Sequence, residues 1–586
     1  MKKLILLLTA MLATSMGLLA QGTSWQNATL INSGETKTGT LDNVTTEVWY
    51  KINVTQEGHV DFEATATGTL KFGTSNCQFY GFKNGSTYSR GYFSGSDNYV
   101  NYITYHAIDA GQGTYYIKIW RGGGTGTYTL KYTFTPCPYS NDPEPNNNYQ
   151  NSSLLQSGAT VQGRLGYRTS DDVTDTYDWY KIVVPEEGKV EFKAIASETL
   201  KFGTSNSQFY GFKDGNIYSR GYFSGSDNYV DTITYQATDV GKGTYYIAIW
   251  RGGGSGGYSL YYKFTPCPQA ADPEPNNDYE HSSLLESGET VQGRLGYRAS
   301  DNVTDTYDWY KIVVPEEGKV EFKAIASETL KFGTSNSQFY GFKDGNTYSR
   351  GYFSGSDNYV DTITYQATDV GKGTYYIAIW RGGGNGGYSL YYKFTPCPLA
   401  ADPEPNNDYE QASWLKSGRI AQGRLGYRAS DNVIDTYDWY RIKVTKTGPV
   451  EIIVTPTENL TFMTSSTSIN VIKNNSLYTV SQFHAQSTGS TTLVCQINEL
   501  EEGTYYVRIS RNGGSGGYRI TYNGPALTGD VDGDNRLTIN DVTDMISYLL
   551  GYNNPSFAIG DADVDGDGRI SISDVTELIY LLLTAN

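Results

Sequence analysis

The chain contains 586 residues, with 62 acidic and 45 basic side chains and a formal net charge of −17. Contacts to nucleic-acid phosphates need basic patches, so this balance argues against nucleic acid as a partner. The sequence also holds 66 glycines and 52 tyrosines, and extended helical patterns occur only near its C-terminus. This composition predicts a mainly all-β protein.

A secretory signal peptide is predicted at residues 1–20. Lys2 and Lys3 form its basic start, residues 4–8 open an apolar stretch, and small residues lead to Ala20. No later apolar run approaches the length of a membrane span. We therefore expect a secreted, extracellular protein that stays at the cell surface only where a partner holds it.

Four tandem repeats follow the predicted signal peptide. Trp49, Trp179, Trp309 and Trp439 recur at intervals of 130 residues, each within a Trp-Tyr-(Lys/Arg)-Ile segment. A unit of this size can bury its own core, so we expect four separate domains rather than turns of a solenoid. The predicted boundaries are 21–137, 138–267, 268–397 and 398–525 for the repeats, and 526–586 for a C-terminal domain.

Each repeat carries the pattern of half-buried strands joined by turns. Residues 180–184 and 190–194 alternate between apolar and polar side chains around a turn, and residues 244–250 and 258–262 flank a glycine-rich tip. We expect each repeat to be an antiparallel, jelly-roll-like β-sandwich of about eight strands.

Two motifs recur in repeats 2 to 4. Asp-Pro-Glu-Pro-Asn-Asn opens each repeat, as at residues 272–277, and Asp-Thr-Tyr-Asp-Trp-Tyr follows, as at residues 305–310. On these motifs the repeats resemble bacterial pre-peptidase C-terminal domains, which are sandwiches appended to secreted enzymes. The resemblance implies polymer binding, as in some members, and calcium binding through the acidic opening, as in others.

Within this resemblance the calcium ligands would be oxygen side chains of the acidic opening. Repeat 1 lacks the opening and has Thr46, Glu47 and Val48 before Trp49. A polar linker with capped turns is the alternative interpretation of this segment. The candidate ligands are Asp142, Glu144, Asn146, Asn147, Asp272, Glu274, Asn276, Asn277, Asp402, Glu404, Asn406 and Asn407.

Aromatic residues on the predicted strands suggest a second kind of site. If the alternate residues face the core, a set of rings faces outward, where it could stack on pyranose rings of a polysaccharide. The alternative is that these rings pack under loops or against the next repeat. The candidates for sugar stacking are Trp179, Tyr246, Trp250, Trp309, Tyr376 and Trp380.

The repeats lack a recognisable catalytic constellation. Residues 253–257 fit a Gly-x-Ser-x-Gly elbow, but Asn385 replaces the serine in the next repeat, and a nucleophile cannot be exchanged for asparagine. The four histidines share no position in the repeat frame, which removes histidine acid–base chemistry from the repeated unit. We therefore assign no catalytic residues, which favours a non-enzymatic protein and leaves the question of catalysis open.

The chain has five cysteines: Cys77, Cys137, Cys267, Cys397 and Cys495. Export permits disulfides, yet the number is odd, and Cys77 with Cys137 is the one pair available within a repeat. Ser207 stands where the first repeat has Cys77, so a bridge is not essential to the fold. We expect mostly free, buried thiols.

Two copies of a calcium-loop pattern lie near the C-terminus, 33 residues apart. Oxygen side chains occupy loop positions 1, 3, 5, 9 and 12, and position 7 can give its backbone carbonyl, which is the spacing that a hard cation with six to eight oxygen ligands needs. Asn535 and Gly568 stand at the turn position, which favours positive φ. The predicted ligands are Asp530, Asp532, Asp534, Arg536, Thr538 and Asp541, and Asp563, Asp565, Asp567, Arg569, Ser571 and Asp574.

One short amphipathic helix follows each loop. Its apolar residues repeat at i, i+3, i+4, i+7 and i+8, from Val542 to Leu550 and from Val575 to Leu583. Two loop–helix units with aspartate at position 12 resemble a dockerin domain, a small all-α module. The resemblance implies two calcium ions and a cohesin-domain partner. It assigns cohesin contacts to Ile539, Asn540, Ile546, Ser547, Ile572, Ser573, Ile579 and Tyr580.

The sequence is thus interpreted as a secreted, non-catalytic, calcium-binding protein that docks onto a cohesin-bearing scaffold or cell-surface protein. Its repeats would act as spacers or as polysaccharide-binding modules. Two alternatives remain: an extracellular hydrolase, or peptidase accessory, in polysaccharide degradation, and a plain surface adhesin.

Overall fold

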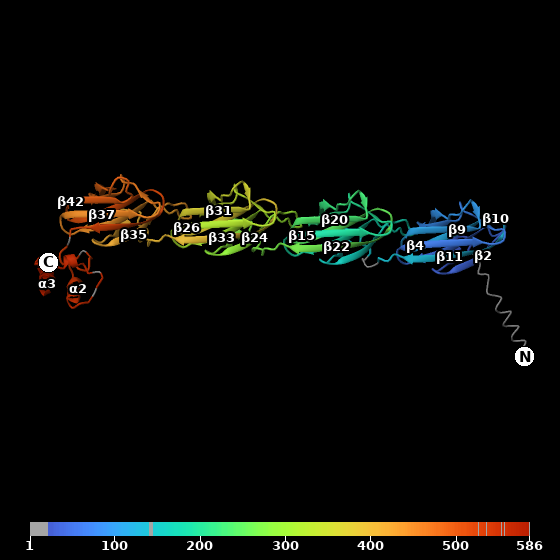
Figure 1. Ribbon diagram of the computed structural model, residues 1–586, viewed down its shortest axis with the longest axis horizontal. Helices are drawn as coiled ribbons and strands as arrows, with labels where there is room; N and C mark the ends of the chain where they lie inside the picture. Colours follow the sequence, from blue (N-terminus) through green and yellow to red (C-terminus); the bar gives the residue numbers. More distant parts are fainter. Residues whose placement is uncertain are drawn as a thin grey trace, which may run out of the picture. The chain divides into compact units, whose positions relative to one another are not determined.

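The computed structural model describes residues 22–139, 144–525, 527–534, 536–552, 554–555 and 557–584 (Figure 1). The predicted signal peptide, Asp142 and Asn535 lie outside the described residues. The chain forms two compact units, Met1–Pro268 with Tyr297–Asp305, and Gln269–Gly296 with Thr306–Asn586. Strands make up 54% and helices 7% of the structure, which confirms the mainly all-β prediction.

Each repeat contains eleven strands in two sheets. Repeat 1 has β1 Thr29–Leu30, β2 Thr36–Leu41, β3 Glu47–Val54, β4 Gly58–Ala66, β5 Lys71–Gly73, β6 Gln78–Lys83, β7 Ser86–Tyr92, β8 Tyr99–Val100, β9 Tyr102–Ala110, β10 Gly113–Gly123 and β11 Gly126–Pro136. Repeat 2 has β12 Ser153–Leu154, β13 Thr160–Leu165, β14 Tyr177–Val184, β15 Gly188–Ala196, β16 Lys201–Gly203, β17 Gln208–Lys213, β18 Asn216–Tyr222, β19 Tyr229–Val230, β20 Thr232–Val240, β21 Gly243–Gly253 and β22 Gly256–Pro266.

Repeat 3 follows the same order, whereas repeat 4 has sheets of six and five strands in place of seven and four. Repeat 3 has β23 Ser283–Leu284, β24 Thr290–Leu295, β25 Tyr307–Val314, β26 Gly318–Ala326, β27 Lys331–Gly333, β28 Gln338–Lys343, β29 Asn346–Tyr352, β30 Tyr359–Val360, β31 Thr362–Val370, β32 Gly373–Gly383 and β33 Gly386–Pro396. Repeat 4 has β34 Ser413–Trp414, β35 Ile420–Leu425, β36 Tyr437–Val444, β37 Gly448–Pro456, β38 Thr461–Phe462, β39 Ser468–Lys473, β40 Ser476–Gln482, β41 His484–Ala485, β42 Leu493–Leu500, β43 Gly503–Gly513 and β44 Gly516–Asn523.

The two sheets of a repeat are unequal. In repeat 2 the larger sheet has the order β12-β14-β21-β16-β19 with the hairpin β17–β18 beside β21, and the smaller sheet has the order β13-β22-β15-β20. The first pair, β12 with β14, is parallel, and the other pairs of the repeat are antiparallel. The count exceeds the expected eight because several strands have only two or three residues, too few to show a sequence period.

The core of each repeat lies between its sheets. Alternate residues of β14, Tyr180, Ile182 and Val184, are buried there, as the alternating pattern predicted. Tyr180 and Tyr258 join the two sheets through a hydrogen bond of 2.6 Å between their hydroxyls, which satisfies two polar groups inside an apolar core. All five cysteines are buried, and Cys77, Cys137, Cys397 and Cys495 are free thiols, which agrees with the expectation of mostly free, buried thiols.

The C-terminal domain is helical. Helix α2 spans Ile539–Leu549, helix α3 spans Ile572–Thr584, and a single 3-10 turn, η5, spans Ile559–Asp561. The core of this domain contains Val531, Val542, Met545, Ala562, Val575 and Leu578. Four further 3-10 turns begin the repeats: η1 Trp25–Asn27, η2 Tyr149–Asn151, η3 Tyr279–His281 and η4 Tyr409–Gln411. Within the described residues, no helix has the length and apolar character that crossing a membrane requires.

Candidate metal centres

Among the residues that the structure describes, five groups of three carboxylates have the geometry of a cation site. In each group the three oxygens lie within 4.8 Å of one another. Two groups lie in the C-terminal domain, and three lie at the beginnings of repeats 2 to 4. The groups are Asp530, Asp532 and Asp541; Asp563, Asp565 and Asp574; Glu144, Asp175 and Asp178; Asp272, Glu274 and Asp308; and Asp402, Glu404 and Asp438.

The first C-terminal loop is organised around Asp541, at the start of α2. One oxygen of this carboxylate accepts from the N–H of Asp532 at 3.2 Å, and the other accepts from the N–H of Thr538 at 2.8 Å. Asp530 and Asp532 in turn accept from the N–H of Asp534, at 3.0 and 2.9 Å. These bonds wrap the loop around its own carboxylates and leave the remaining oxygens for a cation.

The second loop repeats this arrangement around Asp574. Its carboxylate accepts from the N–H groups of Val564 at 2.7 Å and Ser571 at 2.8 Å. Burial raises the pKa of Asp574, but the hydrogen bonds from Ser571, Asp565 and Val564 outweigh it, so the pKa stays below its ordinary value. The Oδ1 atom of Asp563 is buried without a hydrogen-bond partner. A buried carboxylate oxygen with no donor is suited to an oxygen-seeking cation such as calcium.

The helices that follow the loops leave apolar residues exposed. The sequence predicted one apolar stripe per helix, yet only Val542 and Met545 of α2 and Val575 and Leu578 of α3 are buried. The residues predicted to contact cohesin are exposed, except for half-buried Ser547. Ile539 and Ile572, at equivalent positions, are 68% and 70% exposed. An apolar surface of this kind marks a protein interface.

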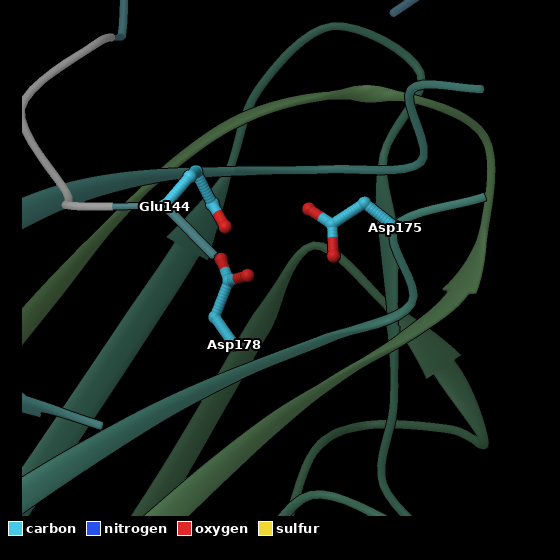
Figure 2. A group of neighbouring side chains, drawn as sticks. All are labelled: Glu144, Asp175 and Asp178. Carbon is cyan, nitrogen blue, oxygen red and sulfur yellow. The ribbon is translucent and has the colours of Figure 1, made fainter. Parts of the chain in front are cut away.

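In repeat 2 the acidic group joins three segments. Figure 2 shows the carboxylates of Glu144, Asp175 and Asp178 turned toward one another. Glu144 belongs to the acidic opening, Asp175 precedes β14, and Asp178 lies within it. The acidic opening was predicted to supply the ligands, and Glu144 does belong to the group, whereas Asn147 is exposed outside it.

The sequence-based ligand set omitted Asp178 and its equivalents Asp308 and Asp438. All three are completely buried. A signal was available in the sequence. Asp178 lies two residues before Tyr180 and four before Ile182, so it is on the same face of β14 and points toward the core. An ionisable side chain at such a position needs a partner, a proton or a metal.

Repeat 4 shows the electrostatic consequence of gathering these acids. Burial, and then the neighbouring Asp402, raise the pKa of Glu404 to about 7. Burial and the charges of Asp402 and Asp435 also raise the pKa of Asp438 well above its ordinary value. The carboxylates therefore resist ionising together in the absence of a cation, and a divalent ion would remove that penalty.

Buried asparagines complete the repeat sites. The amide of Asn406 donates to Asp402, and its Oδ1 atom is buried without a hydrogen-bond partner, as is Oδ1 of Asp438. Asn276 has the same unpartnered Oδ1. Since cation ligands in proteins include both carboxylate and amide oxygens, the residues present fit a calcium-type ion.

The predicted sugar-stacking residues lie on the outer face of the larger sheets. Trp179 contacts the ring of Tyr210 at a centroid distance of 5.1 Å, and Tyr246 contacts Tyr149 at 5.5 Å. Trp250 contacts Tyr177, and Trp309, Tyr376 and Trp380 make the same contacts in repeat 3. All six rings are half-buried. Stacking on a sugar stays a prediction.

Comparison with known proteins identifies the C-terminal domain. The family model of the dockerin type I domain matches residues 528–583, so this part of the chain is a dockerin type I domain. Dockerin domains bind calcium and bind cohesin partners. No curated protein matches the sequence.

Solved structures resemble the repeats. A pre-peptidase C-terminal domain of collagenase from Bacillus anthracis shows 20% identity, covers 18% of this chain and 94% of its own, and has a TM-score of 0.15. The PBSX exported protein XepA shows 12% identity, covers 44% of this chain and 93% of its own, and has a TM-score of 0.13. The CUB1-EGF-CUB2 domain of human MASP-1/3 shows 10% identity, covers 40% of this chain and 98% of its own, and has a TM-score of 0.12.

Proposed function

We propose that this protein is a secreted, non-catalytic component of an extracellular assembly, attached through its dockerin to a cohesin-bearing scaffold or cell-surface protein. The observation that carries the proposal is the pair of acidic loops, each followed by a helix, within residues 528–583. The predicted signal peptide and the predicted domain boundaries belong to the same proposal.

Two calcium ions fold the dockerin in this proposal. Each ion neutralises three carboxylates that otherwise repel one another, such as Asp530, Asp532 and Asp541. Neutralisation stabilises the loop that precedes each helix, so the helices and their exposed apolar residues become fixed. The other predicted ligands, including the backbone carbonyls of Arg536 and Arg569, complete the two coordination shells.

Docking uses the exposed face of α2 and α3. Isoleucine at positions 539 and 572 offers apolar area and no hydrogen-bonding group, so the cohesin surface that receives it is apolar at that point. Asn540 and Ser573 follow these isoleucines and supply polar contacts around the apolar centre, as interface rims do.

The repeats present further cation sites and aromatic surface. The groups at the beginnings of repeats 2 to 4 each take one calcium ion in this proposal, a role supported by the unpartnered oxygens of Asn276, Asn406 and Asp438. The repeats act as spacers or as polysaccharide-binding modules. Exposed tyrosines on their surfaces, including Tyr222, Tyr229, Tyr352 and Tyr359, support a role in binding an extended sugar polymer.

The experiment that tests docking is capture of the full-length protein on a panel of immobilised type I cohesin modules. We expect capture by at least one module in calcium, loss of binding on chelation, and recovery when calcium returns. A double variant, Asp541→Asn with Asp574→Asn, should not be captured. Equal capture of this variant would contradict calcium-dependent docking.

A further inference from the structure

Within each unit, the second of the two repeats places a loop against the preceding repeat. In the second unit, the joint loop of repeat 4, residues 427–431, lies against repeat 3. The carbonyl of Arg428 accepts hydrogen bonds from the guanidinium of Arg350 at 3.0 Å, the N–H of Gly371 at 2.8 Å and the hydroxyl of Tyr375 at 3.0 Å. One carbonyl with three donors is a specific anchor.

Contacts within repeat 3 hold the guanidinium of Arg350. The side chain of Arg350 is 3% exposed and lies over the rings of Phe339 and Tyr375. It also pairs with Asp369 at 3.1 Å. These contacts orient the guanidinium so that its Nη1 donates to the loop carbonyl.

Repeats 1 and 2, within the first unit, meet in the same way. The carbonyl of Arg168 accepts from Arg90 at 2.9 Å, from the N–H of Gly111 at 2.9 Å and from the hydroxyl of Tyr115 at 2.9 Å. Gly113 lies beside Ser170 so closely that a Cβ atom would come within 2.0 Å of the serine hydroxyl oxygen. A glycine is therefore required where the loop enters.

A second contact connects the joint of repeats 3 and 4 to the acidic group of repeat 4. Arg424, on β35 of repeat 4, pairs with Glu316 at 2.9 Å and Glu317 at 3.0 Å, which form the β25–β26 turn of repeat 3. The backbone N–H of Arg424 donates to Asp402 at 3.3 Å, and Asp402 belongs to the repeat 4 acidic group. In the first unit Arg164 of repeat 2 pairs with Glu57 of repeat 1 at 3.0 Å.

Repeats 1 and 4 each lack one set of the residues that make these contacts. Repeat 1 has Thr40 where repeats 2 to 4 have arginine, and it has no acidic opening. Repeat 4 has Val480 where repeat 3 has Arg350, and its turn reads Lys446-Thr447 in place of two glutamates. The arginine and glutamate residues of the joint are present in the repeats that make these contacts, which supports a role in contact between repeats.

We propose that the joints of repeats 1 and 2 and of repeats 3 and 4 are cation-controlled locks: a divalent ion bound by the acidic group of the later repeat holds its arginine on the glutamate side chains of the preceding repeat and keeps the joint loop in place. The proposal rests on the cation sites of the proposed function and extends them to the preceding repeat. In repeat 4, the carboxylates of Asp402, Glu404 and Asp438 share a small space next to Arg424. Two unpartnered buried oxygens, on Asn406 and Asp438, also point to an ion there.

Charge explains why the ion would close the joint. Without it, the acidic group competes with Glu316 and Glu317 for Arg424, and all these carboxylates repel one another across the boundary between repeats. A divalent ion neutralises the acidic group, so that Arg424 pairs with the glutamates alone. The joint is then attractive, and the loop hydrogen bonds are kept.

Hydrogen exchange of the full-length protein tests the lock. The reporting amides are Phe342, Gly371 and Arg428, which bond across the joint to Ser430, Arg428 and Asp369. We expect calcium to slow their exchange by about tenfold or more relative to chelator, because opening of the joint becomes rarer. Amides of the β26–β33 pairing, inside repeat 3, should be unaffected.

Variants separate the lock from the rest of the proposed function. Asp438→Asn removes one ligand, and Arg424→Gln removes the connection while keeping every ligand. Both should remove the calcium effect at the joint of repeats 3 and 4, while residues 528–583 still respond. Glu321→Gln, a matched charge change in the middle of β26, should behave as wild type.

Two results would overturn the lock. Joint amides that exchange equally slowly with and without calcium, while native mass spectrometry counts an ion in each repeat site, would refute it and leave the proposed cation sites standing. Two bound ions in the whole chain, both lost in Asp541→Asn with Asp574→Asn, would refute the repeat sites and the lock with them, and leave the dockerin intact.

Discussion

The hydroxyl of Ser255 in repeat 2 donates a hydrogen bond of 3.0 Å to the backbone carbonyl of Ile108 in repeat 1. This serine is the centre of the Gly-x-Ser-x-Gly pattern at residues 253–257. In the second unit Ser515 makes the equivalent bond to Thr368 at 2.8 Å. A pattern that could indicate a nucleophile thus supplies a contact between repeats.

The first prediction concerns this contact. Ser255→Ala should leave the fold of repeat 2 intact and weaken its contact with repeat 1 by about 1 kcal/mol, the usual contribution of one hydrogen bond. Faster exchange of the Gly111 and Phe82 amides, which also bond across this joint, would report the loss. Unchanged exchange at both amides would show that the bond contributes nothing.

The second prediction concerns calcium stoichiometry. Asp574 accepts three loop N–H bonds and lies in the second acidic group, so Asp574→Asn should remove one ion from the dockerin and leave the first loop occupied. Native mass spectrometry of the full chain would show one calcium fewer than wild type. The same ion count in both proteins would argue against Asp574 as a ligand.

The third prediction concerns the docking surface. Ile539→Asp with Ile572→Asp should abolish cohesin capture, because a charge would be buried at the centre of an apolar contact. Calcium binding should be retained, since neither side chain is a predicted ligand. Ile420→Asp is the control, because Ile420 is 65% exposed in repeat 4, outside the dockerin. Capture of the double variant at wild-type affinity would exclude this surface.

The fourth prediction concerns pH. Burial and Asp402 raise the pKa of Glu404 from its ordinary 4.5 to about 7. Between these values the folded, cation-free state holds a proton that the unfolded state has lost, so stability falls as the pH rises through this range. Urea denaturation followed at repeat 4 should show this decline in chelator and a much smaller decline in calcium. A rise in stability over the same range without calcium would contradict the acidic group.

Most features that could be predicted from the sequence depend on patterns among residues that are close together in the chain. The loops around Asp541 and Asp574 could be predicted because their ligands lie within twelve residues of one another. Strands such as β14 could be predicted from the alternation of apolar and polar residues. Only part of the acidic group of repeat 2 was predicted. Glu144 was among the expected ligands, but Asp178 was not, because it belongs to a separate segment that the fold brings close.

Contacts between repeats could not be predicted from the sequence. Arg350 and Arg428 are 78 positions apart, and no periodicity connects an arginine in one sandwich with a backbone carbonyl in the next. The exposure of Ile546 and Leu550 was also missed, because the apolar period of α2 gives no measure of how much of its stripe the small core can cover.

Hydrogen exchange over residues 528–583 of the full-length protein would show whether the dockerin folds only when calcium is bound. We expect strong protection of the α2 and α3 amides in calcium and rapid exchange in chelator, because three carboxylates per loop repel one another without an ion. Equal protection of both helices in calcium and in chelator would contradict calcium-dependent folding.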